Sequence, residues 1–180
     1  MVVQLNEFKQ RLAGGGARSN LFQVNVKTWR GGFAPGDKDA EDFLVEAASL
    51  PASSVGVIEV PFRGRRLKIA GDRTFEPWTM TVINDATFSI RNGLESWMNE
   101  INNHVDATGQ VNPVDYASDI EVFQLAKDGS VIKGYTLRNA WPSDLSAIDV
   151  SYGAENEIER FTCTWQYDYW EATAGSITTG

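Results

Sequence analysis

The residue types that most often carry catalysis are scarce in this chain. It has one histidine, His104, and one cysteine, Cys163, so one copy cannot build a metal site from several cysteines and histidines. A serine triad would have to use His104, which falls at the end of a helical pattern. A glycosidase uses two carboxyl groups at a defined distance from each other, which the sequence alone does not give, so such a pair is not excluded. The acids of this chain, however, fall mostly in loops and on polar strand faces. We therefore expect no catalytic residues and no enzyme activity.

Two segments resemble ligand-binding loops without their defining residues. Gly14–Gly16 is followed by Ala17–Ser19 instead of the Lys-Ser/Thr of a phosphate-binding loop, so we interpret the glycines as a hinge. The loop from Arg30 to Asp42 contains four acids, but it lacks the later glycine and terminal glutamate of a calcium loop. Those acids are Asp37, Asp39, Glu41 and Asp42. We expect neither a metal nor any other cofactor.

Charge is distributed unevenly along the chain. Residues 1–75 contain 8 acidic and 11 basic side chains, whereas residues 76–180 contain 16 acidic and 5 basic ones. The acidic part argues against wrapping nucleic acid, because that affinity comes mainly from Lys and Arg displacing counterions. It fits either an acidic solvated surface or two complementary surfaces by which identical copies stack head to tail.

Length and composition predict one domain over residues 1–180. Cys163 lies in an alternating apolar run, which is typical of a buried core thiol and suits a reducing compartment. The first residues lack the apolar core of a secretory signal, and no apolar run approaches the roughly 20 residues that span a bilayer. We expect flexible ends at about 1–18 and about 172–180.

The clearest local pattern follows the turn at residues 70–73. Trp78, Met80 and Val82 alternate with threonines, which predicts a half-buried strand, and Asn84 and Asp85 then offer oxygens to cap a helix. Thr87–Asn103 has an apolar stripe at helical spacing, formed by Ile90, Leu94, Trp97, Met98 and Ile101. This helix should pack against a sheet.

Other apolar runs predict short strands and one hairpin. The hairpin pairs Asp119–Leu125 with Val131–Asn139 around an Asp-Gly turn, and Trp141-Pro142 should end it. The further expected strands or extended pieces are Leu21–Thr28, Val55–Val60, Leu145–Tyr152 and Ile158–Tyr169, Phe43–Val45 is a second apolar run, and a short helix is expected at Gln4–Leu12. We predict a mainly β (α+β) fold, a β-sandwich or partly closed barrel with one packed α-helix. Its edge strands could template assembly.

Several segments together resemble the tail tube proteins of contractile-tailed, T4-like bacteriophages. They are Ser19–Val26 (SNLFQVNV), Leu50–Arg66 (LPASSVGVIEVPFRGRR), Lys68–Asp85 (KIAGDRTFEPWTMTVIND), Ala140–Leu145 (AWPSDL) and Asn156–Glu171 (NEIERFTCTWQYDYWE). The resemblance covers nearly the whole chain, and the segments follow one order. The loop at residues 30–42 looks longer than in the family pattern. This insertion could be a surface decoration or a contact to a neighbouring subunit or the sheath.

The resemblance implies the phage tail tube fold and a structural virion protein. Such proteins form hexameric rings whose sheets join into one inner barrel, and the rings stack into a tube inside a contractile sheath. The implied partners are the homo-hexamer, the tail sheath, baseplate and tail terminator proteins, and viral DNA that passes through without specific binding; no membrane is involved. The implied location is the virion tail, assembled in the host cytoplasm.

The resemblance also suggests ring contacts at Asp72 and Arg73 and at Arg65 and Arg66. The first two could equally form a local salt bridge, and the basic cluster at residues 63–68 could be a solvated strand edge. We further expect several acids after residue 75 to face the lumen, where they would repel phosphate. Two alternatives remain: the inner tube of a related contractile injection or secretion particle with protein cargo, and a carbohydrate-binding β-sandwich that uses exposed aromatics.

Overall fold

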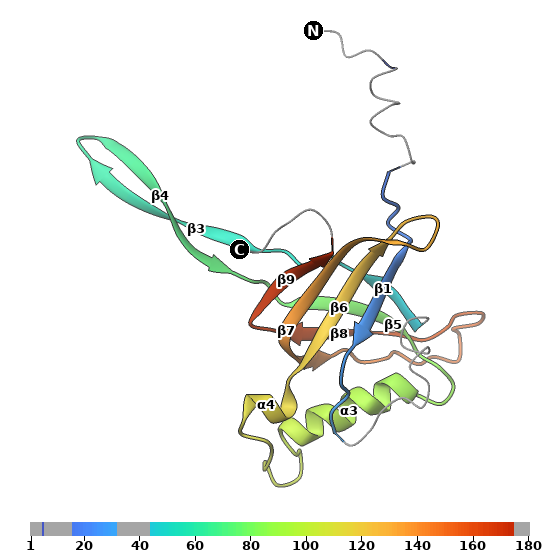
Figure 1. Cartoon of the computed structure of the whole chain (residues 1–180). Coiled ribbons are helices and arrows are strands. Elements are labelled where there is room, and N and C mark those ends of the chain that lie inside the picture. The colour runs from blue at the N-terminus through green and yellow to red at the C-terminus, as the bar shows by residue number, and fades with distance from the viewer. Residues whose placement is uncertain (1–4, 6–15, 32–43, 175–180) are drawn as a thin grey trace.

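The computed structural model describes residues 5, 16–31 and 44–174. Within these residues the elements follow in chain order: β1 (Phe22–Val26), β2 (Val45–Ala48), β3 (Ser54–Phe62), β4 (Arg65–Thr74), β5 (Trp78–Ile83), α3 (Ser89–Ile101), α4 (Pro113–Tyr116), β6 (Ser118–Leu125), β7 (Val131–Leu145), β8 (Arg160–Gln166) and β9 (Tyr169–Ala174). Figure 1 shows a body of strands with α3 across one end and the β3–β4 hairpin projecting from the body. The expected mainly β fold with a packed helix is confirmed.

All strand pairs are antiparallel; β3 and β4 form a separate two-stranded hairpin, and the other seven strands form one sheet that bends along β7. One part has the order β1-β6-β7-β9, and the other continues from β7 through β8 and β5 to β2. β7 pairs with β6 and β9 over its first part, and from Trp141 onward it pairs with β8. Asn139, with φ of 54°, lies where β7 passes from one part to the other. The left-handed region is one that Asn tolerates better than most residues.

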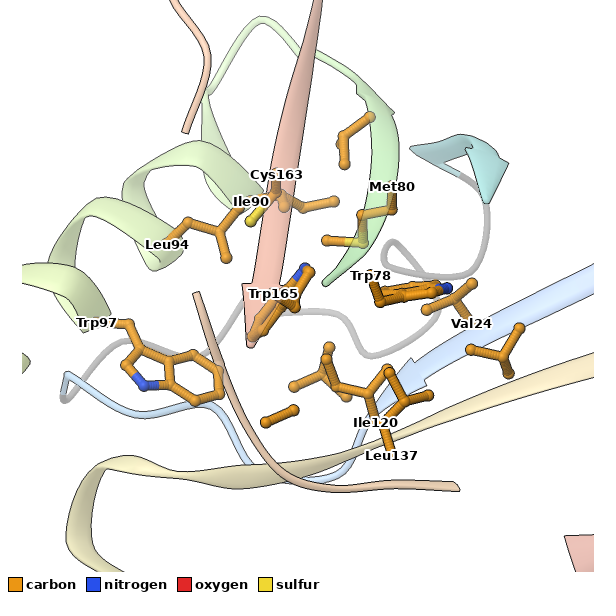
Figure 2. Close-up of a cluster of buried hydrophobic side chains, with 14 of the residues drawn as sticks. Val24, Trp78, Met80, Ile90, Leu94, Trp97, Ile120, Leu137, Cys163 and Trp165 are labelled. Atoms are coloured by element: carbon orange, nitrogen blue, oxygen red, sulfur yellow. The ribbon is translucent and has the colours of Figure 1, made fainter. Parts of the chain in front are cut away.

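The core lies between the two parts of the sheet and α3 (Figure 2). The face predicted for the central strand is confirmed, since Trp78, Met80 and Val82 are all buried. They pair across the sheet with β8, where Trp165 lies opposite Trp78. Trp97 of α3 meets Trp165 edge-on, with ring centroids 5.4 Å apart. Burial of such side chains stabilises the fold by about 1.5–3 kcal/mol each.

The helix predicted at Thr87–Asn103 is present but shorter. It begins at Ser89, where the Asp85 carboxylate accepts the Ser89 N–H at 2.8 Å. Asn84 does not cap it, because its side-chain amide donates to Glu159 at 2.8 Å. Ile90, Leu94 and Trp97 are buried as the stripe predicts.

The predicted end of the hairpin is confirmed, but two other boundaries drawn from the sequence are wrong. The pairing of β6 with β7 stops at Ala140, and from Trp141 onward β7 continues as a strand along β8, with a register shift after Pro142 that accommodates the residue without a ladder N–H. Leu145–Tyr152 is not a strand; β7 ends at Leu145, and the chain from 146 to 159 forms a loop that exposes Val150 and Tyr152.

The last strand is also interrupted. β8 ends at Gln166, and β9 begins at Tyr169 and joins the other part of the sheet beside β7. Phe161, Cys163 and Trp165 therefore share the buried face of β8, whereas Tyr169, at the start of β9, is 43% exposed. β9 continues to Ala174, so the segment expected to fray from Ala172 starts as strand.

Candidate subunit interfaces

Two outer strands of the β1-β6-β7-β9 run have unpaired edges. Among the described residues, β1 pairs only with β6 and β9 only with β7. A free edge presents a row of backbone N–H and C=O groups that another strand can complete. Because the two edges lie on opposite sides of one four-stranded run, a copy on each side would extend the sheet in both directions (Figure 1).

The β3–β4 hairpin has one apolar face that nothing in the described part of the subunit covers. Directly paired residues share a face, so Ile58 with Ile69 and Val60 with Leu67 lie together, next to Phe62. These five side chains are between 40% and 66% exposed. The other face carries the Glu59–Lys68 pair, and Glu59 also forms an ion pair with Arg66 at 2.6 Å. An isolated two-stranded hairpin of this length is marginally stable in water, so the exposed face favours a partner.

The four predicted contact residues all lie on this hairpin and all are exposed. Arg65 and Arg66 begin β4 directly after the turn at the tip of the hairpin, whereas Asp72 and Arg73 lie toward its base. The local salt bridge considered between Asp72 and Arg73 is not among the ion pairs of the described residues, where only Arg66 of the four has such a partner. Whether the four contact another subunit stays a prediction.

Aromatic packing fixes the base of the hairpin to the body. Phe75, which directly follows β4, packs against Tyr167 and Trp170 with centroids 6.1 and 6.3 Å apart. The Trp170 indole N–H donates to the Ala52 carbonyl at 3.2 Å, just before β3. Burial raises the pKa of Tyr167, and Glu76 raises it further. The hairpin is therefore held on both of its strands.

Arg138 lies at the centre of an ion-pair network on the polar face of the β1-β6-β7-β9 run. It reaches Asp119 on β6 at 2.6 Å and Glu171 on β9 at 2.7 Å. The hydrogen bonds that its guanidinium donates to Glu171 and to Asp119 raise its pKa, so it stays ionised. On the same face Lys27 pairs with Glu121 at 3.0 Å. Acidic residues after position 75 do occupy this face, but each of these three has a basic partner.

Sequence reasoning missed the hairpin as a unit. Residues 55–60 were recognised as extended and residues 63–68 as a basic cluster, but their pairing was not. The signal was present: apolar residues alternate on both sides of Arg63-Gly64, both of which have positive φ (46° and 81°). The calcium-like acids, most of the 30–42 loop and the Gln4–Leu12 helix, apart from the exposed Leu5, lie outside the described residues. No helix among the described residues has the length and apolar character to cross a membrane.

The open edges and the uncovered hairpin of the described residues are typical of a subunit of a larger β assembly. The model of the family described as phage tail tube protein matches residues 8–173. Tail tube protein gp19 of Enterobacteria phage T4 is 34% identical over 166 residues, covering 88% of this chain and 93% of the relative. The tail tube protein of Serratia phage KSP90 is 30% identical over 165 residues, covering 91% and 93%. The chain belongs to the phage tail tube protein family, and it is a structural component of the virion tail.

Solved structures of injection particles share the fold. A chain of the PVC extracellular contractile injection system sheath–tube complex in the extended state matches with a TM-score of 0.61 at 18% identity, covering 96% of this chain and 99% of that one. A chain of the six-fold symmetrised anti-feeding prophage baseplate matches with a TM-score of 0.64 at 14% identity, covering 90% and 98%.

Proposed function

We propose that this protein assembles as hexameric rings that stack into the inner tail tube inside a contractile sheath, where it forms the conduit for viral DNA. The observation that carries the proposal is the pair of free edges on β1 and β9 of one four-stranded run. Six copies joined edge to edge would close this run into a continuous barrel, which removes both of these edges. The sheath, baseplate and terminator are the expected partners. The chain acts as one domain without enzyme activity.

The β3–β4 hairpin supplies the second contact in this proposal. Its uncovered apolar face would pack on a neighbouring subunit, and its basic residues would meet acidic groups there. Arg65, Arg66, Asp72 and Arg73 are the contact residues we assign to it, all exposed in the single subunit. Burial of a large apolar side chain contributes about 1.5–3 kcal/mol, so the apolar face would dominate the affinity and the charges would set the register.

The polar face of the four-stranded run would line the lumen. Three acids, Asp119, Glu121 and Glu171, are paired there with two basic side chains, Arg138 and Lys27. These five residues would give the wall a net charge of −1, and the arginine among them is engaged in ion pairs. Specific or tight DNA binding needs Lys and Arg that are free to displace counterions from phosphates. DNA would therefore pass without adhering.

Sequence identity favours phage DNA over protein as the cargo. The 34% and 30% relatives are phage tail tube proteins, whereas the injection-particle chains share the fold at 14% and 18% identity. Membership of the tail tube family also leaves the carbohydrate-binding alternative without support.

The test is negative-stain microscopy with sedimentation velocity across a concentration series of the full chain. We expect six-fold rings at low concentration and hollow tubes of uniform width at high concentration or on added baseplate. A protein that remains monomeric at high concentration and also fails to polymerise from baseplates would overturn the proposal.

A further inference from the structure

A groove of about 570 Å³ lies between α3 and the end of β7. Its floor is apolar, formed by Met98 and Ile101 of α3 with Trp141, Pro142 and Leu145 of β7. The Trp141 indole is held edge-on to Tyr116 of α4, with ring centroids 6.3 Å apart. The floor is therefore a shaped apolar surface on rigid elements.

The surroundings of this groove are acidic. Glu95 lines it, and the exposed Asp144 lies between the lining residues Ser143 and Leu145. Residues 85–116, which include α3, contain five acids and one arginine, Arg91, which pairs with Glu95. A complementary ligand would thus combine an apolar stripe with basic side chains.

The chain contains such a segment in residues 1–15, most of which lie outside the described residues. Leu5, Phe8 and Leu12 recur three and four residues apart, and the charged residues between them are two basic ones, Lys9 and Arg11, and one acid, Glu7. Of this stripe the structure describes Leu5, whose side chain is 65% exposed. Gly14–Gly16 then joins the segment to the body.

The segment leaves the body at the end opposite the groove. Gly16 and Arg18 line a small hollow with Lys127, beside the β6–β7 turn. β1 runs from that end toward α3, and α3 lies across the other end (Figure 1). β7 starts near the turn and ends in the groove; its first nine residues, 131–139, which precede the bend, alone span about 30 Å. In helical form the 11 steps from Leu5 to Gly16 reach only about 17 Å, so the subunit's own groove is remote.

We propose that residues 5–12 of each subunit bind in the α3–β7 groove of a subunit in the next ring. That second subunit is the one that faces the β6–β7 turn of the first. This inference rests on the head-to-tail stacking of the proposed function, which brings one copy's turn end next to the following copy's α3 end. Leu5, Phe8 and Leu12 pack on the Met98–Trp141 floor, and Lys9 and Arg11 face the acids around it. The contact links rings, not neighbours within a ring.

Peptide binding tests the groove independently of assembly. A fluorescent peptide of residues 2–13 is titrated into the full chain at concentrations where it does not polymerise, with anisotropy and tryptophan emission as readouts. We expect saturable binding that Met98→Asp weakens at least tenfold, and that the matched exposed substitution Val150→Asp leaves unchanged. A peptide carrying Leu5→Asp and Phe8→Asp should not bind. Absence of binding by the native peptide would overturn the inference, whatever rings or tubes the protein forms.

Cysteine cross-linking tests the contact between rings. Cys163 is fully buried, so a Leu5→Cys, Asn102→Cys chain offers two accessible thiols, and Asn102 lines the groove. Oxidised tubes should give a disulfide ladder beyond six subunits, and Leu5→Cys with Val150→Cys should not. Cross-links confined to single chains or single rings would overturn the inference. Normal ring stacking by the L5D/F8D variant would also overturn it. If the Met98→Asp variant stacks normally but no longer binds the sheath, the groove is a sheath-binding site and the inference is wrong.

Discussion

The indole N–H of Trp170 donates to the carbonyl of Ala52 at 3.2 Å, although the two residues are 118 positions apart. Trp170 belongs to β9, the strand with a free edge, and Ala52 lies just before the projecting β3. Tyr135 of β7 meets the same indole edge-on at 5.2 Å. One side chain thus couples the two candidate assembly surfaces, so the direction of the hairpin depends on the position of β9.

Replacing Trp170 with Phe should loosen the hairpin more than it destabilises the body. The substitution keeps a ring but removes the bond to Ala52, and one such hydrogen bond contributes about 0.5–1.5 kcal/mol. We expect a small loss of melting temperature, faster hydrogen exchange in residues 54–74, and a higher concentration threshold for assembly. Tyr152→Phe, at a fully exposed site, is the control. Unchanged exchange in the hairpin would contradict the coupling.

Charging the apolar face of the hairpin should block assembly without unfolding the subunit. In the single chain Ile58 and Leu67 are 53% and 59% exposed, so Ile58→Asp with Leu67→Asp should change the free energy of unfolding by no more than about 0.5 kcal/mol per site, as is usual at surfaces. Sedimentation should show monomers where the wild type polymerises. Val150→Asp introduces the same charge away from the hairpin and should polymerise normally. Tubes of normal stability from the double variant would remove the hairpin from the assembly contacts.

The sequence predicted the elements that pack on the core better than those that mediate assembly. Trp78, Met80 and Val82, or Ile90 and Leu94, alternate with the period of their own element because each buries one face inside the subunit. Apolar and polar residues also alternate along the hairpin, but in the proposed assembly its apolar face is covered by another molecule. The pattern therefore indicated no packing partner within the chain, and the apolar runs on the two sides of the turn were not predicted to pair.

Crossings between the two parts of the sheet were also missed, for a different reason. β7 changes partners at Asn139–Trp141, and β8 gives way to β9 across Tyr167 and Asp168. A period-2 pattern continues through both places because it reports alternation along one chain, not which strand lies alongside. Asp168 N–H bonds to the Arg138 carbonyl at 3.0 Å, a long-range contact that no local propensity encodes.

The Arg138 network should contribute modestly to stability and be sensitive to salt. Its three side chains are each about a quarter to two fifths exposed, so each pair should contribute about 0.2–1 kcal/mol. We expect a coupling of this size in a double-mutant cycle of Arg138→Met and Glu171→Gln, measured by urea unfolding. It should shrink in 1 M salt, where the screening length falls to about 3 Å. Arg91→Met, which removes an i,i+4 pair with Glu95, is the control. A coupling unaffected by salt would contradict this account.

Cys163 should be inert in the folded protein and report on unfolding. It lies opposite Met80 in the sheet and has no exposed surface, and burial, with a smaller effect of Asp144, raises the pKa of its thiol. Because the thiolate is the reactive form, a disulfide reagent at pH 8 should label it only as fast as the subunit unfolds. Labelling of Leu5→Cys, at an exposed site, should be complete within the mixing time. Rapid labelling of Cys163 in native protein would show that the β5–β8 core opens locally.

Asp85→Asn should lower stability near neutral pH but not in acid. Burial alone would raise the pKa of the Asp85 carboxyl, but hydrogen bonds from Thr87 and Ser89 outweigh that effect and lower it. A carboxyl with a lowered pKa in the folded state stabilises the protein above its unfolded pKa, about 3.9, and loses that contribution as pH falls through the folded value. The side chain is partly solvated, so we expect about 0.5–1 kcal/mol, the lower range for helix N-terminal caps. The difference in unfolding free energy between wild type and variant should be constant from pH 5 to 8 and diminish below about pH 4. A difference that persists undiminished at pH 2 would mean that the neutral carboxyl caps α3 equally well.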